Sequence, residues 1–269
     1  MAEKQDKKLK KKHSAQKKRL TKVQKRRILR RRRLKLALGI AAVFTLCVVG
    51  IYTTREIDEQ IVSAHQLHSF GWKAEISQQE VDELNRLLEK YHITSKASLT
   101  MFFATVASET DCGRLVLEEG GDAHYAKHGY RAEERGAGYL QITHRSKQLE
   151  FLEAVEDPFQ GADTAAYIAE NYPWESACWV WSVGKTSPAP NPNEYAKTRG
   201  NTPEVFLATQ YGINGWTITD ESLGKIVQGV DYTVSEDGKT VTVDGKAAPL
   251  PKNWPQRLEW YQKAKRIWG

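Results

Sequence analysis

The sequence predicts a mainly helical domain with a small β-sheet, preceded by one transmembrane helix. Three observations lead to this class. An uncharged run over 36–52 has the length of a membrane span. Apolar residues recur at helical spacing in several later segments. Alternation typical of β-strands is confined to two short segments, 139–143 and 229–245.

Residues 1–35 form a basic tail, whereas the rest of the chain is mildly acidic. The tail holds 18 Lys and Arg and two acidic residues, and the other 234 residues hold 22 basic and 31 acidic ones. An acidic body has little reason to bind a phosphate backbone, so nucleic acid is not an expected partner of the body. The tail is expected to bind anionic lipid headgroups, with RNA or DNA as its alternative ligand.

The uncharged run predicts a transmembrane helix over 36–53. The dense basic block before it predicts that the N-terminus stays in the cytoplasm and that the remaining chain lies outside. A buried core helix and a cleaved signal peptide are the alternatives. The long basic region and the lack of a clear small-x-small site argue against cleavage. We therefore expect a single-pass protein of the cell membrane, with a stalk over 54–72 and an extracytoplasmic domain over 73–269.

The first convincing helix of this domain follows a capping box. Ser77 caps the helix amides and Glu80 reaches back, and apolar residues then line one face over 81–91. A second helix begins near Ser98 and is apolar nearly all round, so it should be buried. It ends at Glu109. The negative end of the helix dipole disfavours the charged form of a carboxyl group at this position. Surroundings of low polarity should disfavour it as well, so we expect Glu109 to stay protonated near neutral pH. An ordinary surface glutamate is the alternative.

Later segments predict a tryptophan-rich helix, a hairpin and a last helix. The segment 173–181 is expected to be a core helix, with a sugar-stacking platform as the alternative. Alternation and an Asp-Gly turn predict the hairpin over 229–245. Asn253 should cap the final helix, with Pro255 in its first turn.

The segment 135–143 combines glycines with a short alternating run. Gly136 and Gly138 allow a turn or a close approach of the backbone. A strand after them would place Tyr139, Gln141 and Thr143 on one face. One ring and two hydrogen-bonding side chains suit a sugar, although an ordinary hairpin strand would look the same.

Cysteine and histidine spacing predicts no metal site, and no cofactor is expected. Cys47 lies within the apolar run. Cys112 and Cys178 lie in the exported part, where oxidation is possible, but whether they pair stays open. His124 and His128 are four residues apart, as zinc ligands on one helix face can be. The glycines around them make a stable helix unlikely, so exposed loop histidines are the simpler interpretation.

Several of these segments, 102–113, 117–118 and 135–143, resemble the family 19 glycoside hydrolases. These include plant-type chitinases and the endolysins that cut peptidoglycan. The family pattern is an apolar helix ending in His-Glu, a second glutamate, and Gly-Arg-Gly leading to Ile-Gln-Leu-Thr or Ser. Here Ser108 replaces the histidine and Ala137 replaces the arginine.

Downstream segments extend the resemblance to roughly 78–269. The run 177–181 resembles the aromatic helix of the family. The run 213–215 resembles its Ile-Asn-Gly-Gly, with Trp216 in place of the second glycine. The run 257–269 resembles the final helix of the endolysins. The resemblance implies a lysozyme-like, mainly helical fold, with the hairpin as an insertion.

The resemblance also implies hydrolysis of a β-1,4 glycosidic bond with inversion, by two carboxyl groups about 6.5–9.5 Å apart. Glu109 matches the general acid, Glu118 the second carboxylate, and Thr143 the hydroxyl that helps to hold water. Tyr139, Gln141 and Asn214 are the expected substrate contacts. The other candidates for the second carboxylate are Glu119, Glu133 and Glu134.

The expected protein is thus a membrane-anchored glycoside hydrolase acting on peptidoglycan strands, with chitin as the second choice. A tethered enzyme reaches nearby polymer, which favours the wall. A lytic transglycosylase is an alternative, since such enzymes combine one helix-ending glutamate with a segment similar to 136–143. A degenerate, glycan-binding envelope protein is another, given the departures at Ser108 and Ala137.

Overall fold

The computed structural model describes residues 60–73, 75–183, 191–214 and 218–269, apart from the side chains of Asn214 and Asp220. Gln60–Gly269 form one unit. Within the described ranges, no helix is long and apolar enough to cross a bilayer. The expected tail 1–35 and transmembrane helix 36–53 lie outside these ranges.

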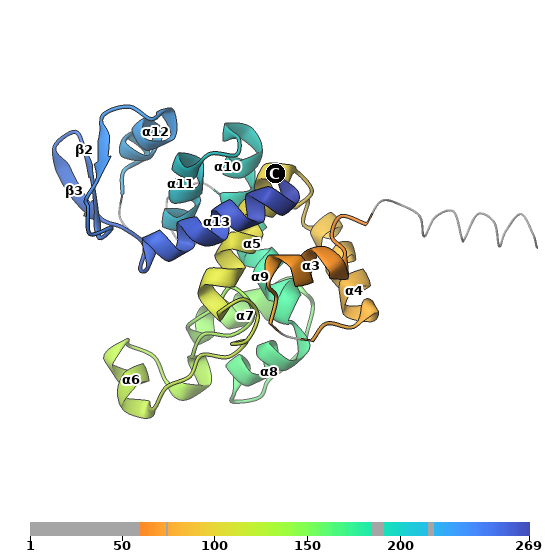
Figure 1. Ribbon diagram of the computed structural model, residues 1–269. Helices are drawn as coiled ribbons and strands as arrows, with labels where there is room; N and C mark the ends of the chain where they lie inside the picture. The colour runs from red at the N-terminus through yellow and green to blue at the C-terminus, as the bar shows by residue number, and fades with distance from the viewer. Residues whose placement is uncertain (1–59, 74, 184–190, 215–217) are drawn as a thin grey trace, which may run out of the picture. The chain divides into compact units, whose positions relative to one another are not determined.

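Helices dominate the unit, and a three-stranded antiparallel sheet of order β1-β2-β3 accompanies them (Figure 1). The helices are α3 Ala64–Phe70, α4 Gln78–Lys90, α5 Lys96–Thr110, α6 Asp122–Lys127, α7 Arg145–Ala154, α8 Thr164–Asn171, α9 Pro173–Ser182, α10 Pro192–Arg199, α11 Pro203–Asn214, α12 Asp220–Gln228 and α13 Trp254–Trp268. A short 3-10 helix covers Ala132–Glu134, and the strands are β1 Tyr232–Val234, β2 Thr240–Val243 and β3 Lys246–Pro249.

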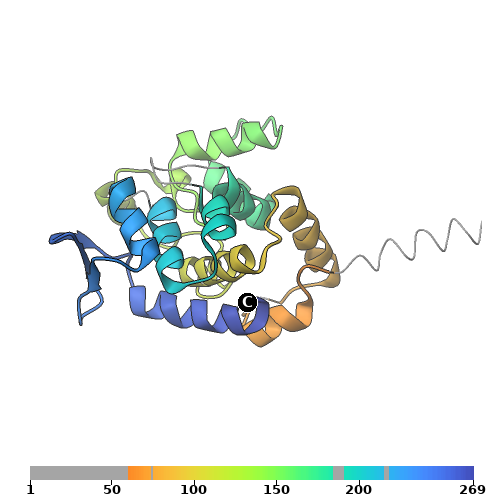
Figure 2. The same cartoon turned by 90° about the horizontal axis from the view of Figure 1, so that it is seen from above.

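Helix α5 lies at the centre of the unit, with α13 packed along it (Figures 1 and 2). Ser95 caps its first turn, so the helix starts slightly earlier than expected. Phe103 stacks on Trp268 of α13 with ring centroids 4.3 Å apart, and Phe102 meets Trp181 of α9 edge-on. The expected burial of this nearly all-apolar helix is confirmed.

The capping box before α4 is confirmed, but the stalk expected over 54–72 is wrong in its second half. Ser77 and Glu80 exchange both hydrogen bonds of the box. A second box, built by Ser63 and Gln66, starts α3. Leu67 of α3 is fully buried, and α3 packs against α13. Burial of these apolar side chains makes α3 part of the folded unit.

The tryptophan-rich segment forms α9 and belongs to the core. Trp174, Trp179 and Trp181 are each at least 95% buried. Rings without exposed faces cannot stack on a sugar, so the alternative of a stacking platform is wrong. The interpretation as a core helix is confirmed.

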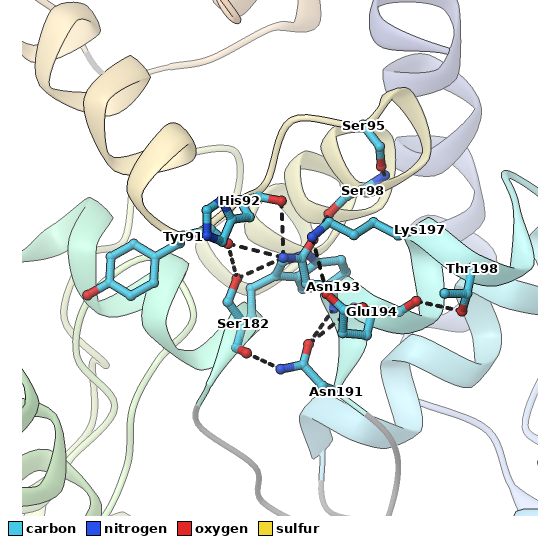
Figure 3. Close-up of polar contacts among 11 residues, drawn as sticks. Tyr91, His92, Ser95, Ser98, Ser182, Asn191, Asn193, Glu194, Lys197 and Thr198 are labelled. Carbon is cyan, nitrogen blue, oxygen red and sulfur yellow. Dashed lines mark hydrogen bonds and ion pairs between the residues drawn. The ribbon is translucent and has the colours of Figure 1, made fainter.

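A buried polar network joins α10 to α5 and α9 (Figure 3). Ser98 donates to Asn193 Oδ1 at 2.5 Å and accepts from Trp181 Nε1 at 2.9 Å. Asn193 Nδ2 donates to the carbonyls of Tyr91 and His92 at 3.1 and 3.2 Å. Each of these partners satisfies a buried polar group, which fixes the mutual placement of the helices.

The hairpin is confirmed, and β3 adds a strand that the alternation did not predict. Tyr232 pairs with Val243 and Val234 with Val241. Gly238 has φ +65°, as the Asp-Gly turn requires. After the sheet, Asn253 precedes α13 with φ +59° and makes no side-chain cap hydrogen bond. The start of the last helix is therefore confirmed, but its expected capping mechanism is wrong.

Cys112 and Cys178 are both buried free thiols. Burial raises the pKa of Cys112 to about 11 and also raises the pKa of Cys178. Neither thiol is therefore reactive in the folded unit.

Candidate active site

A cavity of about 660 Å³ gathers most of the residues expected to act on a substrate. The end of α5, the start of α7 and the segment between them supply one part of its lining, and α9, α11 and the segment before α13 supply another. The lining residues are Glu109, Glu118, Tyr130, Leu140, Gln141, Ile142, Thr143, His144, Lys147, Val180, Ile213 and Lys252. The three predicted catalytic side chains therefore share one cavity.

Glu109 stands in the last turn of α5, where it meets a buried cation. Arg257 Nη1 of α13 lies 2.7 Å from Glu109 Oε1. The contact has the distance of an ion pair without the alignment of a hydrogen bond. The apolar surroundings expected for Glu109 are therefore a wrong description of its environment.

Other contacts hold Arg257 in place. Its Nη1 donates to Gln210 Oε1 at 2.8 Å, and its Nε donates to the carbonyl of Lys252 at 2.9 Å. Gln210 in turn donates to Thr105 Oγ1 of α5 at 2.8 Å. The arginine is 6% exposed. This chain of hydrogen bonds couples α5, α11 and α13 beside Glu109.

Glu118 is held by three donors. Tyr130 Oη lies 2.7 and 2.9 Å from its two oxygens, the Gly136 amide donates to Oε2 at 2.8 Å, and His124 Nε2 lies 3.1 Å from Oε1. Burial acts to raise the pKa of Glu118, but the bonds from Gly136, Tyr130 and His124 outweigh it and lower that pKa. Glu118 is therefore an ionised carboxylate at neutral pH.

The glycine segment positions Glu118 through backbone pairing. The Glu118 amide donates to the Gly136 carbonyl at 2.8 Å, and the Gly138 amide donates to the Val116 carbonyl at 2.8 Å. A Cβ on Gly136 would lie 2.6 Å from Gln141 Oε1. Gly138 has φ +71°, and a Cβ there would overlap the Ser176 hydroxyl. The turn expected at these glycines is present at Gly138, and both glycines let side chains of the same chain approach the backbone closely.

The strand expected over 139–143 is wrong, and so is the role given to Tyr139. Residues 138–141 form a tight turn, closed by a 3.0 Å bond from the Gln141 amide to the Gly138 carbonyl. The Tyr139 ring is 7% exposed and packs against Trp72 and Trp174 at 5.0 and 4.3 Å. Burial raises the pKa of Tyr139 to about 12. The ring is a core element because the turn points it inward.

Gln141 and Thr143 do line the cavity. Gln141 Nε2 donates to the Gly138 carbonyl at 2.9 Å, so part of its amide is committed to the turn. Thr143 Oγ1 donates to the Gln141 carbonyl at 3.0 Å. Because this bond uses the hydroxyl proton, Thr143 offers an acceptor to a water molecule in the cavity.

The other candidate carboxylates do not line this cavity. Glu119 points to solvent, and Glu133 and Glu134 belong to the 3-10 helix. Glu134 pairs with Arg131 at 2.7 Å. The geometry therefore favours Glu118 as the second carboxylate.

The side chain of Asn214 lies outside the described residues, although its neighbour Ile213 lines the cavity. His124 lies in α6, so the glycines did not prevent a short helix there. Its ring centroid is 4.5 Å from that of His128. In the part of the chain that the structure describes, no group of three or more His, Cys, Asp or Glu is placed to hold a metal ion.

Four functional candidates were not predicted from the sequence: Tyr130, His124 as a partner of Glu118, Arg257 and Lys252. Folding of the chain brings each of them to the site, and no sequence motif marks them as site residues. Arg257 falls inside the final-helix resemblance, which is the one signal that pointed toward it.

No protein-family model and no curated protein matches the sequence. Solved structures do match. One is a bacterial family 19 chitinase, with TM-score 0.51 and 18% identity over 78% of this chain and 95% of that chain. A mutant of chitinase C has TM-score 0.52 and 16% identity over 79% and 94%.

Chitinase C from Streptomyces griseus gives TM-score 0.51 and 18% identity over 78% of both chains. At this identity the matches show a shared fold. The chain has the fold of the family 19 chitinases, and the expected mainly helical domain with a small sheet is confirmed.

Proposed function

We propose that this chain is a glycoside hydrolase that cleaves β-1,4 bonds between amino sugars with inversion. One observation carries the proposal: Glu109 and Glu118 line the same cavity with unlike partners. Two carboxyl groups in unlike environments can act as acid and base in one site.

Glu118 acts as the general base. Its lowered pKa keeps it ionised, and its three donors fix its orientation. It takes a proton from a water molecule while the water oxygen bonds to the anomeric carbon. Thr143 accepts a hydrogen bond from that water and so orients it.

Glu109 acts as the general acid. It gives its proton to the oxygen of the leaving sugar as the glycosidic bond breaks. This step turns Glu109 into a carboxylate, which Arg257 at 2.7 Å then stabilises. The cation therefore favours the state after proton transfer.

The substrate is an amino-sugar polymer, either peptidoglycan or chitin. The matching structures are chitinases, which supports a polysaccharide substrate. The uncharged run 36–52 after a basic tail supports an enzyme anchored in the cell membrane with its domain outside. An anchored enzyme of this orientation meets the wall polymer first.

Glutamine variants of the full-length chain in detergent would test this mechanism. The full-length chain retains α3, which belongs to the folded unit. Glu109→Gln removes the transferable proton and should slow release of wall fragments by about 10²–10⁴-fold. Glu118→Gln should cost a comparable factor. Glu119→Gln is the matched control, because this neighbouring residue is exposed and does not line the cavity.

Product masses separate the alternatives. Hydrolysis gives products one water heavier than the anhydro products of a transglycosylase. If Glu109 matters and Glu118 does not, a transglycosylase replaces the hydrolase. If Glu133→Gln or Glu134→Gln is the damaging variant, the base is misassigned. If no variant changes activity, the domain is a glycan-binding protein or acts elsewhere.

Localisation has its own test. Protease added to intact cells should remove the domain and spare the tail 1–35. A domain that is digested only after lysis would place it on the cytoplasmic side.

A further inference from the structure

Two lysines also line the cavity that holds the two glutamates. Lys147 comes from α7, and Lys252 comes from the segment before α13. A neutral sugar polymer requires neither charge. Their presence therefore bears on which polymer the proposed hydrolase takes.

Lys252 carries a charge that the described part of the site does not use. Its side chain is exposed, and its carbonyl is fixed by the 2.9 Å bond from Arg257 Nε. Glu109 is paired with Arg257, and Glu118 with Tyr130, Gly136 and His124. Among the described residues, no carboxylate forms an ion pair with Lys252.

Lys147 makes a cation–π contact and an ion pair with residues that do not themselves line the cavity. Its ammonium lies 5.2 Å from the centroid of the Trp179 ring and 2.8 Å from Glu150 Oε2. The Glu150 side chain is 56% exposed, and a surface pair of this kind contributes little free energy. The pair with Glu150 therefore does little to hinder an approach of this ammonium to a ligand carboxylate.

The charge of the remaining chain makes these lysines more significant. Residues 36–269 hold nine more acidic than basic side chains, so their summed field repels an anionic polymer. Binding of such a polymer needs cations at the point of contact, within about 8 Å at physiological ionic strength. Lys147 and Lys252 line the same cavity as Glu109 and Glu118 and can supply such cations.

We propose that Lys252, supported by Lys147, is a specificity-determining carboxylate receptor that selects an amino-sugar strand bearing carboxylate groups over a neutral one. The inference rests on the proposed hydrolase function. Peptidoglycan strands carry such groups on their stem peptides, or on the lactyl ethers where the stem peptide has been removed, whereas chitin does not.

The test compares three substrates on the full-length protein in detergent: peptidoglycan strands, the same strands with their carboxylates converted to methylamides, and chitin oligomers. The wild type should cleave the carboxylated strands faster than the amidated ones. Lys252→Gln should lower kcat/KM for carboxylated strands about two- to fivefold, the size of one exposed ion pair, and leave the amidated strands unchanged.

Matched variants separate recognition from general damage. Lys246→Gln removes the same charge from an exposed position on β3 that does not line the cavity, so its rates should stay unchanged. Lys147→Met keeps an apolar stem over Trp179 without the charge, and adding it to Lys252→Gln should lower the rate further on carboxylated strands alone.

Three outcomes would overturn the inference while leaving the proposed function intact. The first is equal cleavage of carboxylated and amidated strands. The second is an equal loss on every substrate in Lys252→Gln, which would make the lysine a structural residue. The third is cleavage of chitin oligomers without cleavage of peptidoglycan. Failure of the wild type on all three substrates would instead remove the hydrolase function, and the inference with it.

Discussion

Replacing Tyr130 with phenylalanine should make Glu118 easier to protonate and move the acid limb of the pH–rate profile. The Tyr130 hydroxyl lies within 2.9 Å of both carboxylate oxygens, but it has one proton to donate. Burial and the neighbouring Glu118 raise the pKa of Tyr130, so the phenol keeps that proton throughout the working range. The variant therefore removes one charge-assisted hydrogen bond and leaves the ring in place.

The size of the effect follows from that single bond. A hydrogen bond to a charged group contributes about 1.5–3 kcal/mol, and 1.36 kcal/mol corresponds to about one pKa unit. The Glu118 side chain is 23% exposed, so water replaces part of the lost bond and the lower figure applies. The Gly136 amide and His124 remain as partners. We expect the pKa of Glu118 to rise by about one unit.

The sign can be checked in the pH dependence of kcat/KM, which reports the free enzyme. A general base works only when ionised, so activity is lost as the pH falls through the pKa of Glu118. In the wild type that pKa lies below the ordinary value of 4.5. In Tyr130→Phe the loss should begin at a higher pH, by about one unit.

Tyr125→Phe is the matched control. The Tyr125 hydroxyl donates to the backbone carbonyl of Glu118 at 3.2 Å and not to its carboxylate. It should leave the acid limb in place. An unmoved limb in Tyr130→Phe, or an equal shift in both variants, would show that Glu118 is not the base or that Tyr130 does not control its charge.

Three further predictions concern the core, the acid and the tail. Phe70→Ala should lower the free energy of unfolding by about 3–5 kcal/mol, because the ring is fully buried against Trp268. A denaturant titration showing almost no loss of stability would mean that α3 belongs to a stalk and not to the folded core. Arg257→Met should lower kcat more than it changes KM, since it removes the cation that stabilises the Glu109 carboxylate; an unchanged kcat would refute that role. Replacing the arginines 30–33 with glutamine should weaken binding to anionic vesicles by about 1 kcal/mol per charge, and a preference of the 1–35 peptide for nucleic acid at physiological salt would contradict it.

The sequence itself determined the elements whose signals are local. Ser77 and Glu80 start α4 because a capping box needs residues three positions apart. The apolar composition of 98–109 requires burial wherever the helix goes, and the Asp-Gly turn fixes the hairpin register. The resemblance located Glu109, Glu118 and Thr143, and the structure places all three on one cavity.

Tertiary structure decided the rest, because these features depend on how distant segments pack. Period-two alternation cannot show that Tyr139 turns inward against Trp72, since the tight turn at Gly138 breaks the strand pattern. Helix α3 has seven residues, too few for its sequence pattern to show which face is buried. The packing of α13 against it identifies that face. The partner of Glu109 is Arg257, which reaches it only because α13 packs along α5. The electrostatic surroundings of Glu109 thus come from packing across the chain, which no local spacing encodes.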